Sequence, residues 1–197
     1  MRSAMFPGRL LSGLFALVLC AAGLQAASPT DLPGVHNFHK VNEHVYRGAQ
    51  PSREGFASLA NLGIKTVIDL RGERSEADAV QRAGLRYVRM PWNGHRAPSD
   101  SQMATVLTLL NDNAQWPVFV HCRRGADRTG TAIACYRILH DHWSNQQALA
   151  EAKAFGMSSL EIAMRHYIQS FAPAQIARAA HAAPLTPAVL LAAPAVP

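Results

Sequence analysis

Two continuous runs of largely apolar residues constrain the fold more than any other feature of the 197-residue sequence. KTVIDLR (65–71) and WPVFVHC (116–122) lack the regular polar and apolar alternation of a strand with one solvent-facing side. Each therefore predicts a strand that is covered on both faces. RYVRMP (86–91) predicts another strand. Helical patterns separate these runs, which is typical of an α/β domain with a largely parallel sheet.

Capping residues place the predicted helices. Ser52 precedes one helix, and two capping boxes, Ser99 with Gln102 and Ser158 with Glu161, begin two others. Two short extended pieces are expected in the segment before Ser52. We expect a single α/β domain whose largely parallel central sheet of about four to five strands is flanked by helices. The predicted helices cover residues 53–62, 76–84, 100–110, 129–142, 145–155 and 159–171.

The N-terminal 26 residues have the layout of a secretory signal peptide. Arg2 and Arg9 come first, an apolar stretch over 10–24 follows, and the small residues Ala26 and Ala27 provide a cleavage site. The apolar stretch is short for a transmembrane helix, so we expect no stable membrane span after the leader is removed. The sequence therefore predicts a periplasmic or secreted protein. The alternative is an uncleaved N-terminal membrane anchor that faces the periplasm.

Three segments follow from these patterns: a signal peptide over 1–26, a folded domain over 36–171 and a flexible Ala/Pro-rich tail over 172–197. The formal net charge is +6, from 19 Lys and Arg against 13 Asp and Glu. Loss of the two leader arginines, Arg2 and Arg9, leaves about +4. No Lys/Arg-rich run accompanies this mild charge, so we expect no nucleic-acid partner.

Leader removal leaves two cysteines, Cys122 and Cys135. Cys135 falls inside the predicted helix over 129–142, roughly 9 Å along the axis from Thr129. This position argues against a structural disulfide with Cys122. We expect Cys135 to be a small buried apolar residue.

The segment FVHCRRGADRTG (119–130) joins the last predicted strand to a helix and combines a thiol, three arginines and an aspartate. In an open α/β sheet, ligands bind beyond the carboxyl ends of the strands. A loop that leads into a helix N-terminus directs successive amide groups inward, and the helix dipole reinforces this anion-binding nest. Glycines permit such a backbone path. We therefore predict a phosphate-binding loop formed by Arg123, Arg124, Gly125, Ala126 and Gly130.

Four further residues of this segment carry the predicted chemistry. Cys122 faces arginines and a helix N-terminus, so we expect its sulfur to be ionised at neutral pH and to act as a nucleophile. Arg128 can bind two phosphate oxygens at once, because a guanidinium presents parallel N–H groups. Thr129 offers a hydroxyl toward the sulfur, and His121 can hold the loop through a ring N–H.

HCRRGADRTG (121–130) resembles the HC-x5-R-[ST]-G signature of cysteine-dependent protein tyrosine and dual-specificity phosphatases. VYRGAQPS, KTVIDLRGE and RYVRMP resemble parts of compact atypical dual-specificity phosphatases, and the leader makes the chain similar to exported bacterial members. The resemblance covers residues 38 to 171. It implies phosphomonoester hydrolysis in which Cys122 attacks phosphorus, Arg128 stabilises the charge and a phosphocysteine forms. No cofactor or metal is implied, and the histidines show no metal-ligand spacing.

The resemblance also implies an aspartate, upstream of the cysteine, that protonates the leaving oxygen, and this sequence departs from that pattern. PWNGHRAPSD (91–100) has Asn93 and His95 at the nearest positions, and its carboxylic acid, Asp100, lies closer to the cysteine. Asp100 also suits the first turn of a helix for reasons of dipole alone. Asp127, inside the loop, is a second candidate, although pairing with a loop arginine would equally explain it. His95 is a third, because histidine transfers protons near neutral pH.

The substrate stays open between related classes. The chain has no obvious insertion that would build a deep pocket, which favours phosphotyrosyl proteins together with phosphoseryl and phosphothreonyl ones. The expected partner is a phosphorylated protein or a small phosphomonoester. Arg123 and Arg124 resemble the added cations of phosphoinositide and inositol-phosphate phosphatases, which form an alternative. A phosphate-binding pseudophosphatase is another alternative, because the upstream aspartate is missing.

Overall fold

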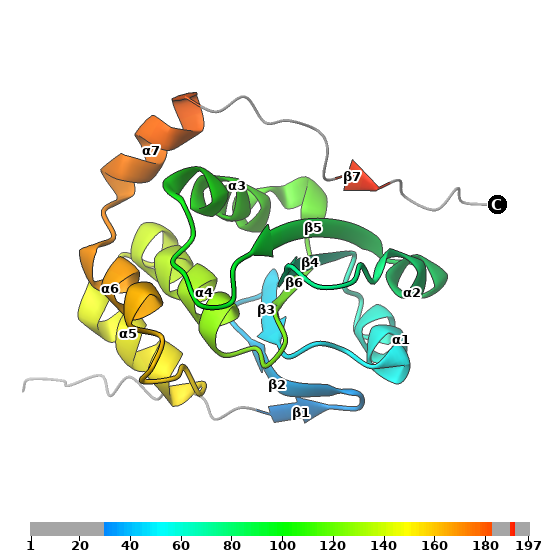
Figure 1. Ribbon diagram of the computed structural model, residues 1–197. Helices are drawn as coiled ribbons and strands as arrows, with labels where there is room; N and C mark the ends of the chain where they lie inside the picture. The colour runs from blue at the N-terminus through cyan, green and yellow to red at the C-terminus, as the bar shows by residue number, and fades with distance from the viewer. Residues whose placement is uncertain (1–29, 183–189, 192–197) are drawn as a thin grey trace, which may run out of the picture.

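The computed structural model describes residues 30–182 and 190–191 as a central sheet with helices on both faces (Figure 1). The predicted signal peptide over 1–26 lies outside the described residues. The strands are β1 (Thr30–Leu32), β2 (Val35–Lys40), β3 (Val45–Gly48), β4 (Thr66–Arg71), β5 (Arg86–Trp92), β6 (Val118–His121) and β7 (Leu190–Leu191). Their order is β1-β2-β3-β6-β4-β5-β7. The four strands β3, β6, β4 and β5 are parallel, and the outer strands pair antiparallel.

The helices alternate with the parallel strands along the chain. They are α1 (Arg53–Asn61), α2 (Ala77–Arg82), α3 (Asp100–Asn111), the 3-10 turn η1 (Asn113–Gln115), α4 (Asp127–His140), α5 (Asn145–Ala154), α6 (Ile162–Ser170) and α7 (Pro173–Ala182). This arrangement confirms the predicted α/β domain with a largely parallel sheet. Within the described residues, no helix combines the length and the apolar character needed to cross a bilayer.

Both faces of the sheet are covered, as the continuous apolar runs predicted. Every residue of β4 is buried. Ile68 and Leu70 pack into a core with α3, α4, α5 and α6, while Val67 packs on the other face with Phe56 of α1 and Val80 of α2. A strand flanked by two cores has no solvent-facing side, so its sequence shows no alternation.

Two predictions for the C-terminal part are wrong. The helix expected over 159–171 begins at Ile162, and Glu161 rather than Ser158 precedes its first turn, without a capping bond from its side chain. The segment expected to be a flexible tail from residue 172 forms α7 over Pro173–Ala182. This helix forms because Ile176 is buried against α3 and because proline suits a first helical position. Residues 183–189 and 192–197 of that predicted tail lie outside the described part.

The sheet order determines where a ligand can bind. β6 lies between β3 and β4, and all three run in the same direction as β5. Their carboxyl ends therefore meet at one edge, and the loops that follow β4, β5 and β6 leave the sheet side by side. This edge is where open α/β sheets bind ligands.

Candidate active site

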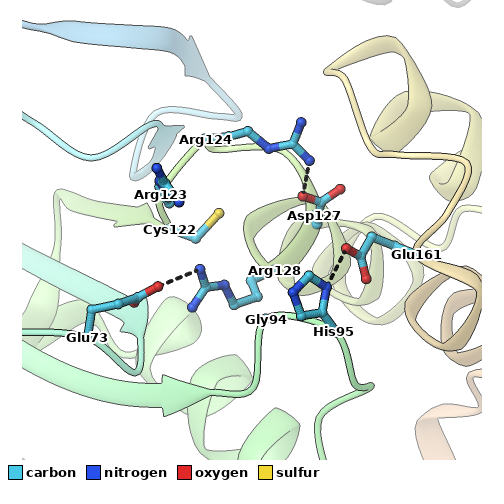
Figure 2. Close-up of a pocket in the computed structure, with 9 residues that line it drawn as sticks. All are labelled: Glu73, Gly94, His95, Cys122, Arg123, Arg124, Asp127, Arg128 and Glu161. Carbon is cyan, nitrogen blue, oxygen red and sulfur yellow. Dashed lines mark hydrogen bonds and ion pairs between the residues drawn. The ribbon is translucent and has the colours of Figure 1, made fainter.

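A pocket of about 500 Å³ opens at this edge of the sheet, above the loop that joins β6 to α4 (Figure 2). Its walls come from the segments that follow β4, β5 and β6 and from the turn before α6. The lining residues are Glu73, Gly94, His95, Cys122, Arg123, Arg124, Asp127, Arg128 and Glu161. Five of them belong to the predicted phosphate-binding segment, and His95 is the third acid candidate.

The backbone of the loop is held from outside through its carbonyl oxygens. Three consecutive carbonyls accept hydrogen bonds from β2, from β3 or from the residue at position 50. The bonds run from Gln50 N to Arg123 O (3.3 Å), from Asn37 Nδ2 to Arg124 O (3.1 Å) and from Arg47 Nη2 to Gly125 O (2.8 Å). In a trans peptide the N–H points opposite to the C=O. The amides that follow these carbonyls are therefore directed toward the pocket, which is the arrangement of an anion nest.

Gly125 is required by both conformation and space. Its φ is +68°, and a Cβ at this position would overlap the main chain of Gly48 and Ala49. Gly130, the last residue of the predicted phosphate-binding loop, serves helix packing. A Cβ there would meet Met157 and Ala152 at 3.3 and 3.4 Å. The start of α4 therefore lies close to α5.

Cys122 and Arg128 face the same pocket from opposite ends of the loop (Figure 2). Cys122 follows β6 directly and is 2% exposed. The Nη1 of Arg128 lies 3.4 Å from the carbonyl oxygens of both Leu70 and Trp92, and its Nη2 lies 3.6 Å from Glu73 Oε1. These contacts anchor the guanidinium at the ends of β4 and β5, beside the sulfur.

Arg47, on β3, is a buried cation beneath the loop. Besides its bond to Gly125 O, its guanidinium lies 4.3 Å from the ring centroid of Phe155. Burial lowers the pKa of Arg47 to about 10, while Glu151 and Cys122 act in the opposite direction. Its Nε and Nη1 have no hydrogen-bond partner among the described residues. A buried positive charge favours any anion nearby, so Arg47 stabilises negative charge at the loop.

Behind the loop, His121 lies in a buried polar cluster. Its Nε2 lies 3.5 Å from Glu76 Oε2 and 4.0 Å from Asp69 Oδ1. Burial lowers the pKa of His121 to about 4, and Asp69 and the main chain of Cys122 only partly offset this effect. The ring is therefore neutral at physiological pH. The predicted hydrogen bond from its ring N–H to the loop is absent from the described contacts.

The same cluster has the residue types of a metal site, since ligand atoms of Asp69, Glu76 and His121 lie within 4.8 Å of one another. Arg71 already provides a cation there. Its Nε and Nη2 each donate a hydrogen bond of 2.9 Å to Asp69, and its Nη2 also lies 2.8 Å from Glu76 Oε2. Burial opposes the ionisation of Asp69, but the hydrogen bonds from the side chain and main chain of Arg71, together with the charge of Arg71, lower the pKa of Asp69. The carboxylates thus have a guanidinium as their counterion.

The three acid candidates have different surroundings. Asp100 is not among the lining residues, and its Oδ1 accepts a hydrogen bond from the Tyr167 hydroxyl (2.9 Å). Asp127 lines the pocket, but its oxygens accept bonds from Ser158 N (2.9 Å) and Arg124 Nη2 (2.6 Å). Only His95 comes from the loop after β5 and also presents a titratable group to the pocket.

Thr129 and Ala126 complete the predicted set. Both are buried, and the Thr129 hydroxyl has no hydrogen-bond partner, the sulfur of Cys122 included, among the described residues. Ala126 precedes α4, and its carbonyl accepts a bond from Gly130 N (2.7 Å). Cys122 and Cys135 are both free thiols, as predicted.

Sequence reasoning missed three residues of the site: Arg47, Glu73 and Glu161. The first two lie within VYRGAQPS and KTVIDLRGE, segments that carry the family resemblance, so a signal was present. A charged residue inside an otherwise apolar strand, such as Arg47, indicates a buried role. The sequence predicts only a capping role for Glu161, and nothing local indicates its contact with His95.

Comparison with known proteins agrees with the geometry of the site. Residues 32–170 match the family described as DSP-PTPase phosphatase fused to NAD+ kinase. The chain is similar to the dual specificity protein phosphatase TpbA of Pseudomonas aeruginosa, with 31% identity over 120 residues, 61% of this chain and 55% of TpbA. It is also similar to the inositol diphosphatase SIW14 of Saccharomyces cerevisiae, with 26% identity over 152 residues, 73% of this chain and 54% of that protein. The chain thus spans about half the length of these relatives.

Solved structures show the same fold. The crystal structure of P. aeruginosa TpbA aligns with a TM-score of 0.67 and 26% identity, over 81% of this chain and 97% of that one. The core catalytic domain of SIW14 from S. cerevisiae, in complex with citrate, aligns with a TM-score of 0.66 and 26% identity, over 75% and 92%. With a family match over more than half of its length and the fold of two solved phosphatases, the chain belongs to the DSP-PTPase phosphatase family.

Proposed function

We propose that this chain is a phosphomonoesterase that removes phosphate from phosphotyrosyl proteins through a phosphocysteine on Cys122. Phosphoseryl and phosphothreonyl proteins are further substrates under this proposal. One observation carries it: Cys122 and Arg128 face one pocket across a loop whose carbonyls are held outward. A thiolate, a guanidinium and inward amides together form a receptor for a tetrahedral dianion above a nucleophile.

The reaction has two steps in this geometry. The sulfur of Cys122 attacks phosphorus, the S–P bond forms, and the P–O bond to the leaving group breaks with its electron pair on the leaving oxygen. Arg128 and the loop amides bind the equatorial oxygens, where they stabilise the charge of the transition state. Water then attacks the phosphocysteine, and the sulfur leaves as thiolate. The guanidinium and amides supply this stabilisation without a metal ion.

The charges that line the pocket support a singly phosphorylated substrate. The arginines Arg123, Arg124 and Arg128 are matched in number by three carboxylates. Glu73, Asp127 and Glu161 would repel the further phosphates of an inositol polyphosphate. TpbA is named a dual specificity protein phosphatase and SIW14 an inositol diphosphatase. The matched charges favour the activity named for TpbA.

The experiment is hydrolysis of para-nitrophenyl phosphate by the purified protein in EDTA, with Cys122→Ser as the matched variant. The proposal requires turnover by the native protein and its loss in the variant. If no turnover depends on Cys122 at any pH from 5 to 8, a phosphate-binding pseudophosphatase is the better account. A phosphotyrosyl peptide and an inositol pyrophosphate, offered in competition, then separate the two substrate classes.

We also propose that the protein is exported to the periplasm or secreted, with cleavage near Ala26. The order of basic, apolar and small residues over 1–26 supports this proposal. Mass spectrometry of the protein, recovered from the periplasmic fraction of a Gram-negative host, should show the N-terminus near residue 27. Recovery in the membrane fraction with the leader intact would instead indicate the N-terminal anchor.

A further inference from the structure

We propose that His95, oriented by Glu161, is the acid that protonates the leaving oxygen. This assignment rests on the proposed phosphatase function and extends it to a group that sequence reasoning ranked last. Glu161 is a positioning residue under this proposal, and His95 is the catalytic one.

The two side chains meet at the mouth of the pocket. His95 Nδ1 lies 3.2 Å from Glu161 Oε1, and both residues line the pocket together with Cys122. The side chain of His95 is 89% exposed, whereas that of Glu161 is only 12% exposed. Figure 2 shows the ring of His95 with one nitrogen toward Glu161 and the other toward the interior of the pocket, on the side of Arg128. Glu161 thus assigns Nδ1 as the outer nitrogen and leaves Nε2 for a substrate.

The backbone on each side of this pair is fixed. Asn93 Oδ1 accepts a hydrogen bond from His95 N (2.9 Å), which shapes the loop after β5 as a tight turn. On the other side, Asp127 Oδ1 accepts from Ser158 N (2.9 Å), so the turn before α6 is attached to the phosphate-binding loop. The position of His95 relative to Cys122 is therefore fixed through a chain of contacts: His95 to Glu161, and the turn that carries Glu161 to Asp127 of the phosphate-binding loop through Ser158 N.

The other carboxylates near the site are poor acids. Both oxygens of Asp127 already accept hydrogen bonds, from Arg124 Nη2 and Ser158 N, so both are engaged away from a leaving group. A hydrogen bond to its own main chain and the charge of Arg128 lower the pKa of Glu73. Asp100 bonds to Tyr167 and does not line the pocket. Glu161, the remaining carboxylate that lines the pocket, is engaged with His95 Nδ1 at 3.2 Å. We therefore assign the transferable proton to His95.

The proton balance closes over the two steps. In the first step, the leaving oxygen takes the electron pair of the broken P–O bond and the proton from Nε2 of the imidazolium, whose Nδ1–H remains bonded to Glu161. The ring is then neutral. In the second step, Nε2 accepts a proton from the water that attacks the phosphocysteine, the S–P bond breaks toward sulfur, and the imidazolium is restored.

The test compares aryl phosphates with good and poor leaving groups, because an acid matters most for a poor one. We expect His95→Ala to lower kcat/KM about 100-fold for phenyl phosphate and less than about threefold for 2,4-dinitrophenyl phosphate. His95→Asp should restore turnover of phenyl phosphate, with an optimum at lower pH. Glu161→Gln should lower phenyl phosphate turnover about tenfold, and adding it to His95→Ala should cause no further loss.

Two control variants remove a side chain that could also transfer a proton but that lies outside the pocket. His166→Ala removes an exposed histidine of α6, and Asp100→Asn removes the acid candidate outside the pocket; both should leave the leaving-group dependence unchanged. An equal loss on both esters in His95→Ala, or a steep dependence in Asp100→Asn, would overturn the assignment. If Cys122→Ser and the native protein hydrolyse the activated ester alike, the phosphatase function itself fails, which the leaving-group comparison alone would not reveal.

Discussion

Arg47 is fully buried, and its Nη2 donates a hydrogen bond of 2.8 Å to the carbonyl oxygen of Gly125. The burial of this cation is unfavourable, as its lowered pKa of about 10 shows. Its benefit is local, because it turns one loop carbonyl away from the pocket and places positive charge beneath an anion site. Stability and function therefore make opposite demands on this residue.

Arg47→Met should lower activity without lowering stability. Without this bond the loop amide that follows Gly125 is no longer held toward the pocket, so we expect kcat/KM for para-nitrophenyl phosphate to fall about 10-fold to 100-fold. The melting temperature should stay equal or rise, since an apolar side chain of similar length replaces a buried charge. Arg53→Met, at an exposed position of α1, is the matched control and should change neither quantity. Unchanged kcat/KM in Arg47→Met would show that the loop holds its shape without this bond.

Gly125→Ala should cost more than the same change at Gly84. Both glycines have positive φ, +68° and +75°, but a Cβ at Gly84 meets nothing within 4 Å, whereas one at Gly125 overlaps the chain at Gly48. Left-handed backbone alone costs alanine about 1 to 2 kcal/mol, which is the loss expected for Gly84→Ala. Gly125→Ala should lower the free energy of unfolding by more than this amount and should lower kcat/KM more than about 100-fold. Circular dichroism checks that the variant is folded, and similar losses in the two variants would contradict the steric argument.

The short-range parts of the site could be predicted from the sequence. Cys122, Gly125 and Arg128 lie within one loop, so their spacing and the flanking strand and helix define the chemistry locally. The parallel strands were predictable for the same reason, because a strand buried on both faces shows this in its own residues. The order of the strands depends on packing between segments that are distant in sequence, and no local pattern encodes it.

The parts that could not be predicted depend on distant contacts. His95 and Glu161 are 66 positions apart and meet only because α6 packs beside α4 at the mouth of the pocket. The sequence offers Asp100 as an acid because a carboxylic acid is the expected group, but the first turn of α3 directs its side chain toward Tyr167. The Ala/Pro-rich composition of 172–197 predicts a flexible tail, but residues Pro173–Ala182 form an amphipathic helix, and Ile176 is buried against α3.

Asp127→Asn should lower kcat/KM only slightly, and by the same factor for substrates with good and with poor leaving groups. The amide oxygen can still accept from Ser158 N, and only the ion pair with Arg124 is lost. Arg124 is 59% exposed in this pair, so the pair contributes about 1 kcal/mol or less, and kcat/KM should fall no more than about fivefold. Asp127→Ala loses both bonds and should cost more, because the turn that carries Glu161 is released. A steep leaving-group dependence in Asp127→Asn would make Asp127 the acid in place of His95.

Glu76→Gln should stabilise the protein at alkaline pH and much less at acidic pH. Burial raises the pKa of Glu76 from its ordinary 4.5 to about 7, since Arg71, the guanidinium beside it, is already shared with Asp69. The folded state therefore holds a proton that the unfolded state releases between pH 4.5 and 7, and the free energy of unfolding falls as pH rises through this window. His121 stays neutral there, because its pKa is lowered to about 4.

Urea unfolding at pH 5.5 and pH 8 measures this effect. The side-chain amide that the variant carries at this position cannot ionise. The free energy of unfolding of Glu76→Gln should therefore be about 2 kcal/mol higher than that of the native protein at pH 8, and this difference should shrink toward pH 5.5. Glu54→Gln, a substitution at an exposed position of α1, is the control and should change the free energy of unfolding by the same amount at pH 5.5 and at pH 8. If Glu76→Gln destabilises the protein more at pH 8 than at pH 5.5, the ionised carboxylate is the form that the cluster needs. Its pairing with Arg71 over 2.8 Å would then outweigh its burial.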